Sequence, residues 1–359
     1  MKRPWFAVPL LLALVPTAAR AQAPAADSAD KPAEKPAEKP AEKPGKWSGY
    51  VMGDFYYYAA DHDKAFEKQS GLWFRRIYLG YDREIGGNWG VRIRMEAGSK
   101  GFNETADKLT PFLKDAYLKW VNGRHGAFIG LSPSPTWEVP ETIWGYRSVE
   151  KTPLDLYKWG GSRDLGLAFK GSFDAQKKFG YHAFFGTGTD TKSETDKDKK
   201  LYLALQARPA TGWTLEGYLD WESRKGDKDV STAQIFGAYE HKKGRAGVQY
   251  AHQTRKQGVD KPALELDVFS AFAAARLKDK AWIYGRFDRM LDPNPDGAKI
   301  AYITFDPTAK YNYVILGLDL IPTPSVHFQP NLKLVTYDEV AGKKPDSDVI
   351  LSLTFFYVF

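Results

Sequence analysis

The chain has 359 residues, no cysteine, 22 prolines and a formal net charge of +7, and its aromatic residues are 11 Trp, 20 Tyr and 21 Phe. The lack of cysteine excludes thiolate metal sites, thiol nucleophiles and disulfide bonds. After the N-terminus no apolar run reaches about 18 residues, which excludes a polytopic helical membrane protein.

Residues 1–21 are predicted to be a cleaved secretory signal peptide. Its basic start is Lys2-Arg3, its apolar stretch covers 5–15, and a small-x-small cleavage pattern covers 19–21. An uncleaved anchor is the alternative, but this apolar stretch is too short for a bilayer core of ~30 Å. Cleavage removes three basic residues and lowers the net charge from +7 to +4. That modest excess does not favour a nucleic-acid partner.

Residues 22–46 are predicted to form an extended periplasmic linker. The tetrapeptide Lys-Pro-Ala-Glu occurs three times between positions 31 and 42. A proline at every fourth position interrupts helix and favours extended, solvated backbone that buries nothing. The composition supports a spacer between the membrane and the periplasm. Contact with the peptidoglycan of the cell wall is an alternative that stays open.

From residue 47 to the end, apolar and polar residues alternate with a period of two. In 89–97 the odd positions are apolar and the even positions are charged or glycine; 213–221 repeats this pattern, and 349–359 follows it less strictly. Because alternate side chains of a strand face opposite sides, each segment has one apolar and one polar face.

Short and long connections alternate between these segments. The short ones lie near 84–87, 122–125, 174–177, 208–212, 241–244, 278–280 and 321–325. The long ones lie near 59–70, 99–111, 132–162, 188–198, 223–229, 255–262, 291–308 and 338–347. Seven short and eight long connections imply sixteen strands, and residues 47–359 are therefore predicted to form an all-β, antiparallel transmembrane barrel.

Two details bear on this prediction. Residues 300–305 also have a strand-like pattern, but a seventeenth strand would break the even number expected of bacterial barrels, so we assign them to an outer loop.

A soluble β-sandwich would alternate as well. Tryptophans near the segment ends favour the barrel, since they match an interfacial girdle. These are Trp89, Trp120, Trp213, Trp221 and Trp282, of which Trp282 has inward parity and is the weakest.

The end of the chain resembles the assembly signal of outer-membrane barrels. The final phenylalanine, Phe359, follows aromatic residues at alternate positions, Phe355 and Tyr357. With the predicted signal peptide, this resemblance implies a location in the bacterial outer membrane. The expected partners are outer-membrane lipid and the barrel-assembly machinery.

The body resembles the phosphate-selective porin O and P family in four short stretches, 144–147, 162–167, 315–319 and 330–331. The resemblance implies a water-filled passive channel for small hydrophilic or anionic solutes, usually a homotrimer, without a cofactor or a metal. In that family, arginine ladders and a lysine-rich inner site select phosphate. This chain departs from that pattern because its longest loop is slightly acidic. The sequence therefore predicts a weak anion preference, and phosphate preference stays open.

The longest connection, 132–162, is predicted to fold into the lumen as a constriction loop. It carries Trp137, Trp144, Tyr146 and Tyr157, which need cover from water. An exposed loop is the alternative, but such loops are usually polar. The charged residues expected to face the passage are Glu138, Glu141, Arg147, Glu150, Lys151, Asp155 and Lys158.

The opposing charges are expected on the barrel wall. Alternation in two neighbouring strands turns Arg76, Arg92 and Arg94 inward, together with Glu96. Three guanidinium groups in a narrow lumen would create a local positive potential. The alternative is that they pair with acids such as Glu96, Asp115 or Asp288. Three further residues have inward parity on other strands: Lys119, Arg286 and Lys333.

Enzymatic activity is not expected. An outer-membrane lipase or protease needs a nucleophile or acid with a histidine beside it. The six histidines are scattered, and no serine lies in a Gly-x-Ser-x-Gly motif. A structural or adhesive barrel with a plugged lumen is the remaining alternative, which the polar inward positions disfavour.

Overall fold

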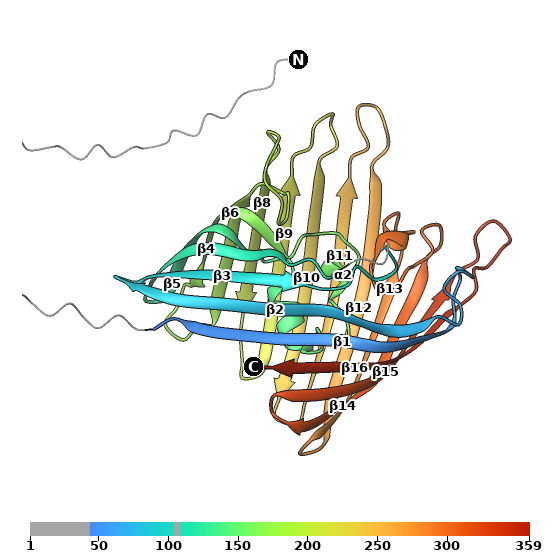
Figure 1. Cartoon of the computed structure of the whole chain (residues 1–359). Helices are drawn as coiled ribbons and strands as arrows, with labels where there is room; N and C mark the ends of the chain where they lie inside the picture. Colours follow the sequence, from blue (N-terminus) through green and yellow to red (C-terminus); the bar gives the residue numbers. More distant parts are fainter. Residues whose placement is uncertain (1–43, 104–107) are drawn as a thin grey trace, which may run out of the picture. The chain divides into compact units, whose positions relative to one another are not determined.

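The computed structural model describes residues 44–103 and 108–359. Within them, sixteen strands form one closed antiparallel barrel in which β1 pairs with β16 (Figure 1). The predicted barrel is confirmed, and residues 300–305 form no strand. The predicted signal peptide and residues 22–43 of the predicted linker lie outside the described residues.

The strands follow one another around the barrel in chain order. The first eight are β1 (Lys46–Ala60), β2 (Ser70–Gly86), β3 (Trp89–Ala97), β4 (Phe112–Asn122), β5 (His125–Pro133), β6 (Arg163–Ser172), β7 (Phe179–Gly186) and β8 (Lys200–Ala207). The second eight are β9 (Trp213–Glu222), β10 (Val230–His241), β11 (Gly244–Arg255), β12 (Leu264–Lys278), β13 (Ala281–Met290), β14 (Tyr311–Thr323), β15 (Val326–Tyr337) and β16 (Asp348–Val358).

The helices are short and lie in the long loops. They are α1 (Glu138–Trp144), α2 (Pro153–Leu156) and the 3-10 turns η1 (Gly101–Asn103) and η2 (Gly297–Lys299). Among the residues described, no helix has the length and apolar character needed to cross a membrane.

The connections differ sharply between the two ends of the barrel. One end, here called the turn end, holds seven connections of two to six residues, the start of β1 and the end of β16. The other, the loop end, holds eight connections of seven to twenty-nine residues. The β2–β3 turn is among the tightest, and Gly87 and Asn88 adopt φ values of 58° and 70°, which favour glycine and asparagine. Turn chemistry thus supports the short-long alternation.

The barrel is apolar outside and polar inside. In β9, Glu216, Tyr218 and Asp220 are buried, whereas Leu219 and Trp221 are exposed on the other face. This is the arrangement of a transmembrane barrel with a polar lumen. Alternation along the sequence therefore identified the two faces correctly.

Three of the five proposed girdle tryptophans, Trp89, Trp213 and Trp221, are exposed at strand ends, and Trp120 pairs with Trp89 across β3 and β4. The assignment of Trp282 to the girdle is wrong. It lies inside the barrel, where the guanidinium of Arg245 stacks over its ring at 5.6 Å. Its position in the strand has inward parity, so its side chain faces the lumen.

The chain end closes the barrel. Gly49 and Phe359 exchange two backbone hydrogen bonds of 3.0 Å, and Phe355 lies opposite Gly53 on β1. The aromatic ending is therefore part of the seam between the first and last strands. Its role as an assembly signal stays a prediction.

Candidate functional site

The long segment between β5 and β6, residues 134–162, lies inside the ring of strands and carries α1 and α2 (Figure 1). We call it the lumen segment. It is held from several sides of the wall: Arg245 of β11 donates to the carbonyl of Trp144 at 3.2 Å, and Gln253 of the same strand donates to that of Trp159 at 2.7 Å. Four strands further around the wall, the hydroxyl of Ser148 donates to Gln329 of β15 at 2.6 Å.

Its aromatic residues are covered by wall side chains. Trp144 packs against Phe272 of β12 with ring centroids 5.3 Å apart, and Tyr146 stacks on Tyr284 of β13 at 4.0 Å. Tyr157 donates its hydroxyl proton to Asp288 at 2.8 Å. The need of these rings for cover explains why a loop of this composition turns inward.

Glu150 is the centre of a buried network. Its carboxylate accepts hydrogen bonds from Arg75 at 2.8 Å, Lys333 at 3.0 Å and Tyr313 at 3.2 Å. Burial alone would raise the pKa of Glu150, but Arg75 and Lys333 hold it well below its usual value. The predicted wall residue Lys333 thus anchors the lumen segment instead of facing an open passage.

Arg286 has the same role on β13. It pairs with Asp288 at 2.5 Å and donates to the carbonyl of Lys151. Both Arg286 and Asp288 are buried. This ion pair is one of the alternatives that the sequence left open for the inward arginines.

A second network ties together charges of the lumen segment itself. Arg147 bridges Glu141 and Asp155, and Lys151 reaches Asp155 at 2.6 Å. Burial raises the pKa of Glu141 to about 7, opposed by Arg147 and reinforced by the neighbouring Asp155. Burial would raise the pKa of Asp155 too, but Lys151 and Arg147 hold it well below its usual value.

Glu138 connects α1 to the wall. Its two carboxylate oxygens lie 2.9 Å from Lys170 of β6 and 3.1 Å from Nδ1 of His182 of β7. Burial opposes ionisation, but His182 and Lys170 outweigh it and lower the pKa of Glu138 to about 2.

The three predicted wall arginines face inward, and each is paired with an acid. Arg76 meets Glu96 at 2.5 Å and Arg92 meets Asp82 at 2.8 Å. Arg94 meets Asp115 at 2.7 Å. The structure therefore favours the alternative of paired arginines over a cluster of unopposed charge.

Two cations that parity did not predict lie inside because of β-bulges. In β2 the partners of Met52 and Gly53 are Arg76 and Phe74, which leaves Arg75 as an extra residue. In β4 an equivalent irregularity leaves Lys114 extra, and Lys114 pairs with Glu96 at 2.9 Å. A bulge turns an adjacent residue to the same side and reverses the parity beyond it, and no local sequence signal marked either one.

A cavity of about 300 Å³ lies between the lumen segment and the wall formed by β4, β6, β8 and β9. Glycines and threonine supply part of its lining, and charged residues supply most of the rest. Its six cations are Lys114, Lys151, Lys158, Arg163, Lys200 and Arg224, and its three acids are Asp155, Asp190 and Glu222. Six against three leaves an excess of three positive charges. We call this space the basic cavity.

A wider cavity of about 780 Å³ adjoins it at the loop end and shares Gly188, Glu222 and Arg224 with it. The wider cavity is also mostly basic. Its cations are Arg224, Lys225, Lys228, Arg255, Lys256 and Lys261, against Asp196, Asp198 and Glu222. The wider cavity is lined mainly by the loops after β7, β9 and β11, and it meets the basic cavity at the end of β9.

Lys158 stands out among the residues of the basic cavity. It is exposed, makes no ion pair or hydrogen bond within 44–103 and 108–359, and has a φ of 60°. That conformation favours glycine and is costly for a lysine. Although the side chain is exposed, the protein around it removes part of its water, and this partial desolvation together with the neighbouring Lys151 lowers the pKa of Lys158. By contrast, Lys119 on β4 covers Gly90 and does not line the cavity.

Comparison with known proteins identifies the fold. No protein-family model matches the chain, and no curated protein is similar to it in sequence. An anion-selective porin from Comamonas acidovorans superposes with a TM-score of 0.65 at 12% identity, over 88% of this chain and 99% of that one. The outer membrane channel DcaP of Acinetobacter baumannii gives 0.62 at 13%, over 88% and 97%.

A third solved structure, the trimer form of the outer membrane protein OmpT of Vibrio cholerae, gives a TM-score of 0.62 at 12% identity, over 88% of this chain and 99% of that one. At these identities the likeness shows the fold. The chain has the sixteen-stranded barrel found in porins of the bacterial outer membrane.

Proposed function

We propose that the protein is an outer-membrane porin, a passive channel for small hydrophilic solutes with a weak preference for anions. The observation that supports this most directly is the basic cavity, where six cations meet three acids beside the lumen segment. A narrow space with low-dielectric walls concentrates the field of such an excess and raises the local concentration of counter-ions.

The preference is weak because most of these cations have acid partners. Arg163 pairs with Asp115 at 2.5 Å, and Lys200 lies 3.2 Å from Glu222. An anion entering the cavity therefore meets only a partial positive field, with Lys158 as the least opposed donor. Phosphate, with several acceptor oxygens, fits the same donors as other small oxyanions, so phosphate permeation is included in the proposal.

The proposed setting follows the fold and the sequence. The apolar outer wall would contact outer-membrane lipid, and residues 1–21 would direct export. The chain end would be recognised by the barrel-assembly machinery through Phe355, Tyr357 and Phe359. A homotrimer is the proposed assembly, and the channel would work without a cofactor or enzymatic chemistry.

Planar-bilayer recording in a salt gradient tests the proposal. We expect steady single-channel steps and a reversal potential on the anion side, which the substitution Lys158→Gln moves toward cations. The matched control is Lys64→Gln, which removes a lysine paired with Glu67 at 2.9 Å outside the basic cavity. Replacing chloride by inorganic phosphate measures the preference of the channel for phosphate over chloride.

The outcomes separate the parts of the proposal. An absence of steps would favour a structural or adhesive barrel. Steps with cation preference would overturn the assignment of the basic cavity while leaving the channel intact.

A further inference from the structure

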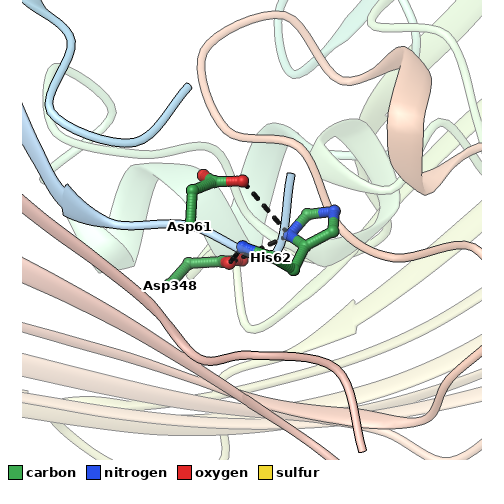
Figure 2. A group of neighbouring side chains, drawn as sticks. All are labelled: Asp61, His62 and Asp348. Atoms are coloured by element: carbon green, nitrogen blue, oxygen red, sulfur yellow. Dashed lines mark hydrogen bonds and ion pairs between the residues drawn. The ribbon is translucent and has the colours of Figure 1, made fainter. Parts of the chain in front are cut away.

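A compact group of three side chains lies where the barrel closes. Asp61 and His62 directly follow β1, and Asp348 begins β16 (Figure 2). His62 and Asp348 are 286 positions apart in the chain, and the pairing of the first strand with the last brings them together. The group belongs neither to the lumen segment nor to the basic cavity.

The three side chains converge on one point. Nδ1 of His62 lies 2.9 Å from an oxygen of Asp348 and 3.4 Å from an oxygen of Asp61. One ligand atom from each of the three residues lies within 4.8 Å of the others. In a tetrahedral site with bonds of about 2.0–2.1 Å, ligand atoms are roughly 3.3 Å apart. Figure 2 shows the other ring nitrogen of His62 directed away from both acids.

Burial makes the group costly without a cation. Asp61 and Asp348 are 1% and 0% exposed, so two negative charges approach each other away from water. The Oδ2 atom of Asp61 is buried and has no hydrogen-bond partner among the residues described. Two buried like charges are unfavourable, and a cation bound between Asp61 and Asp348 offsets their repulsion.

The surroundings orient the Asp348 carboxylate. Tyr337, the last residue of β15, donates its hydroxyl proton to one oxygen at 2.5 Å. The backbone N–H of His62 donates to the other oxygen at 2.7 Å. Such outer contacts typically fix a carboxylate that binds a metal.

Two other histidines of this chain, His252 and His327, also contact acids, but neither has two acids at the same ring nitrogen. His252 meets Glu265 and Asp267, but through its two different ring nitrogens, so these groups do not share a centre. His327 meets one acid, Asp319, at 2.9 Å. Of the residues described, only the group at the seam offers three ligating side chains close to one point.

We propose that Asp61, His62 and Asp348 bind one divalent transition-metal cation of the Zn²⁺ type, which links the loop after β1 to the start of β16. Imidazole nitrogen with carboxylate oxygen suits Zn²⁺, and three protein ligands leave a fourth position for water. The ligands come from both sides of the seam, so the cation acts as a cross-link at the loop end. Protonated His62, serving as the cation itself, is the opposing explanation.

The test measures Zn²⁺ binding to the purified, folded protein in detergent by equilibrium dialysis, with Co²⁺ absorption as a second readout. We expect one Zn²⁺ per chain and a rise in the thermal unfolding midpoint when Zn²⁺ is added. Asp61→Asn and His62→Gln should each weaken binding more than about tenfold. The matched control His327→Gln, at a pair with one acid, should bind as the wild type does.

Circular dichroism checks that each variant keeps its barrel. If His62→Gln fails to fold, Asp61→Asn decides, since it preserves the shape of the side chain. Binding well below one Zn²⁺ per chain, binding unaffected by Asp61→Asn, or equal loss in His327→Gln would overturn the proposal. The first of these results would favour the protonated histidine.

Discussion

The two sides of the lumen use the same residue types in different ways. Toward β11–β15 and β2, the lumen segment fits against the wall with stacked rings and buried ion pairs, such as Glu150 with Arg75 and Lys333. Toward β4, β6, β8 and β9, cations outnumber acids around a hollow. We call these the closed side and the open side.

The difference shows that the number of charges facing the lumen does not determine its field. On the closed side Arg75, Arg286 and Lys333 are buried and each has an acid within hydrogen-bond distance, because an unpaired charge there would be costly. On the open side water can solvate a charge, so an excess such as Lys158 persists. Selectivity should therefore depend on the open side and stability on the closed side.

The largest effect is expected from Glu150→Gln, which leaves Arg75 and Lys333 buried without their counter-charge. We expect the free energy of unfolding to fall by about 3 to 5 kcal/mol. Released contacts of the lumen segment should also raise single-channel conductance. Urea unfolding and bilayer recording measure the two effects, and unchanged values in both would mean that the closed side does not depend on this network.

A smaller effect is expected from Tyr157→Phe. The substitution removes the hydroxyl that donates to Asp288 but leaves the pairing of Asp288 with Arg286. Losing one donor to a charged group should cost about 1.5 to 3 kcal/mol of unfolding free energy. Tyr250→Phe is a control, since its hydroxyl also donates to an aspartate but is exposed. A larger loss in the control would contradict the assignment of stability to the closed side.

The pH dependence of the unfolding free energy should show the raised pKa of Glu141. Burial raises its pKa to about 7 from an ordinary value of 4.5, so the folded protein binds the proton more tightly than the unfolded chain. This contribution to stability is complete below pH 4.5 and is lost as the pH rises through about 7. Unfolding midpoints of wild type and Glu141→Gln across this range isolate the effect. If their difference does not vary with pH, the raised pKa is refuted.

The smallest effect is expected from removing a matched pair on the wall. Arg92 and Asp82 are both partly exposed, and such pairs contribute about 0 to 1 kcal/mol. The double variant Arg92→Gln with Asp82→Asn removes opposite charges together, so the reversal potential should stay constant. A shift as large as that of Lys158→Gln would mean that selectivity is not confined to the open side.

The barrel was predictable because its signals are local. Alternation and the lengths of connections depend only on neighbouring residues, and they located the strands and both faces. The position of the lumen segment was also foreseeable, since Trp144, Tyr146 and Tyr157 could not stay in water. The alternation of polar and apolar positions and the aromatic content thus predicted most of the architecture.

The charge arrangement was not predictable in the same way. The partners of Arg94 and Glu150 lie on other strands, and pairing depends on register and on the path of the lumen segment. Arg75 and Lys114 were missed because a bulge reverses parity without leaving a mark in the sequence. Residues 300–305 have a strand-like pattern, yet they form no strand in the structure. Tyr302 instead contacts the wall, where its hydroxyl accepts a hydrogen bond from Arg76 of β2 at 2.9 Å.

The two bulges have a consequence for how such a channel can change over generations. Each places one additional cation inside, Arg75 or Lys114, while the strand keeps its neighbours on both sides. A one-codon insertion or deletion at such a point would add or remove one lumenal charge and preserve the number of strands. The inner lining can therefore diversify by small genetic steps that leave the membrane-facing surface almost untouched.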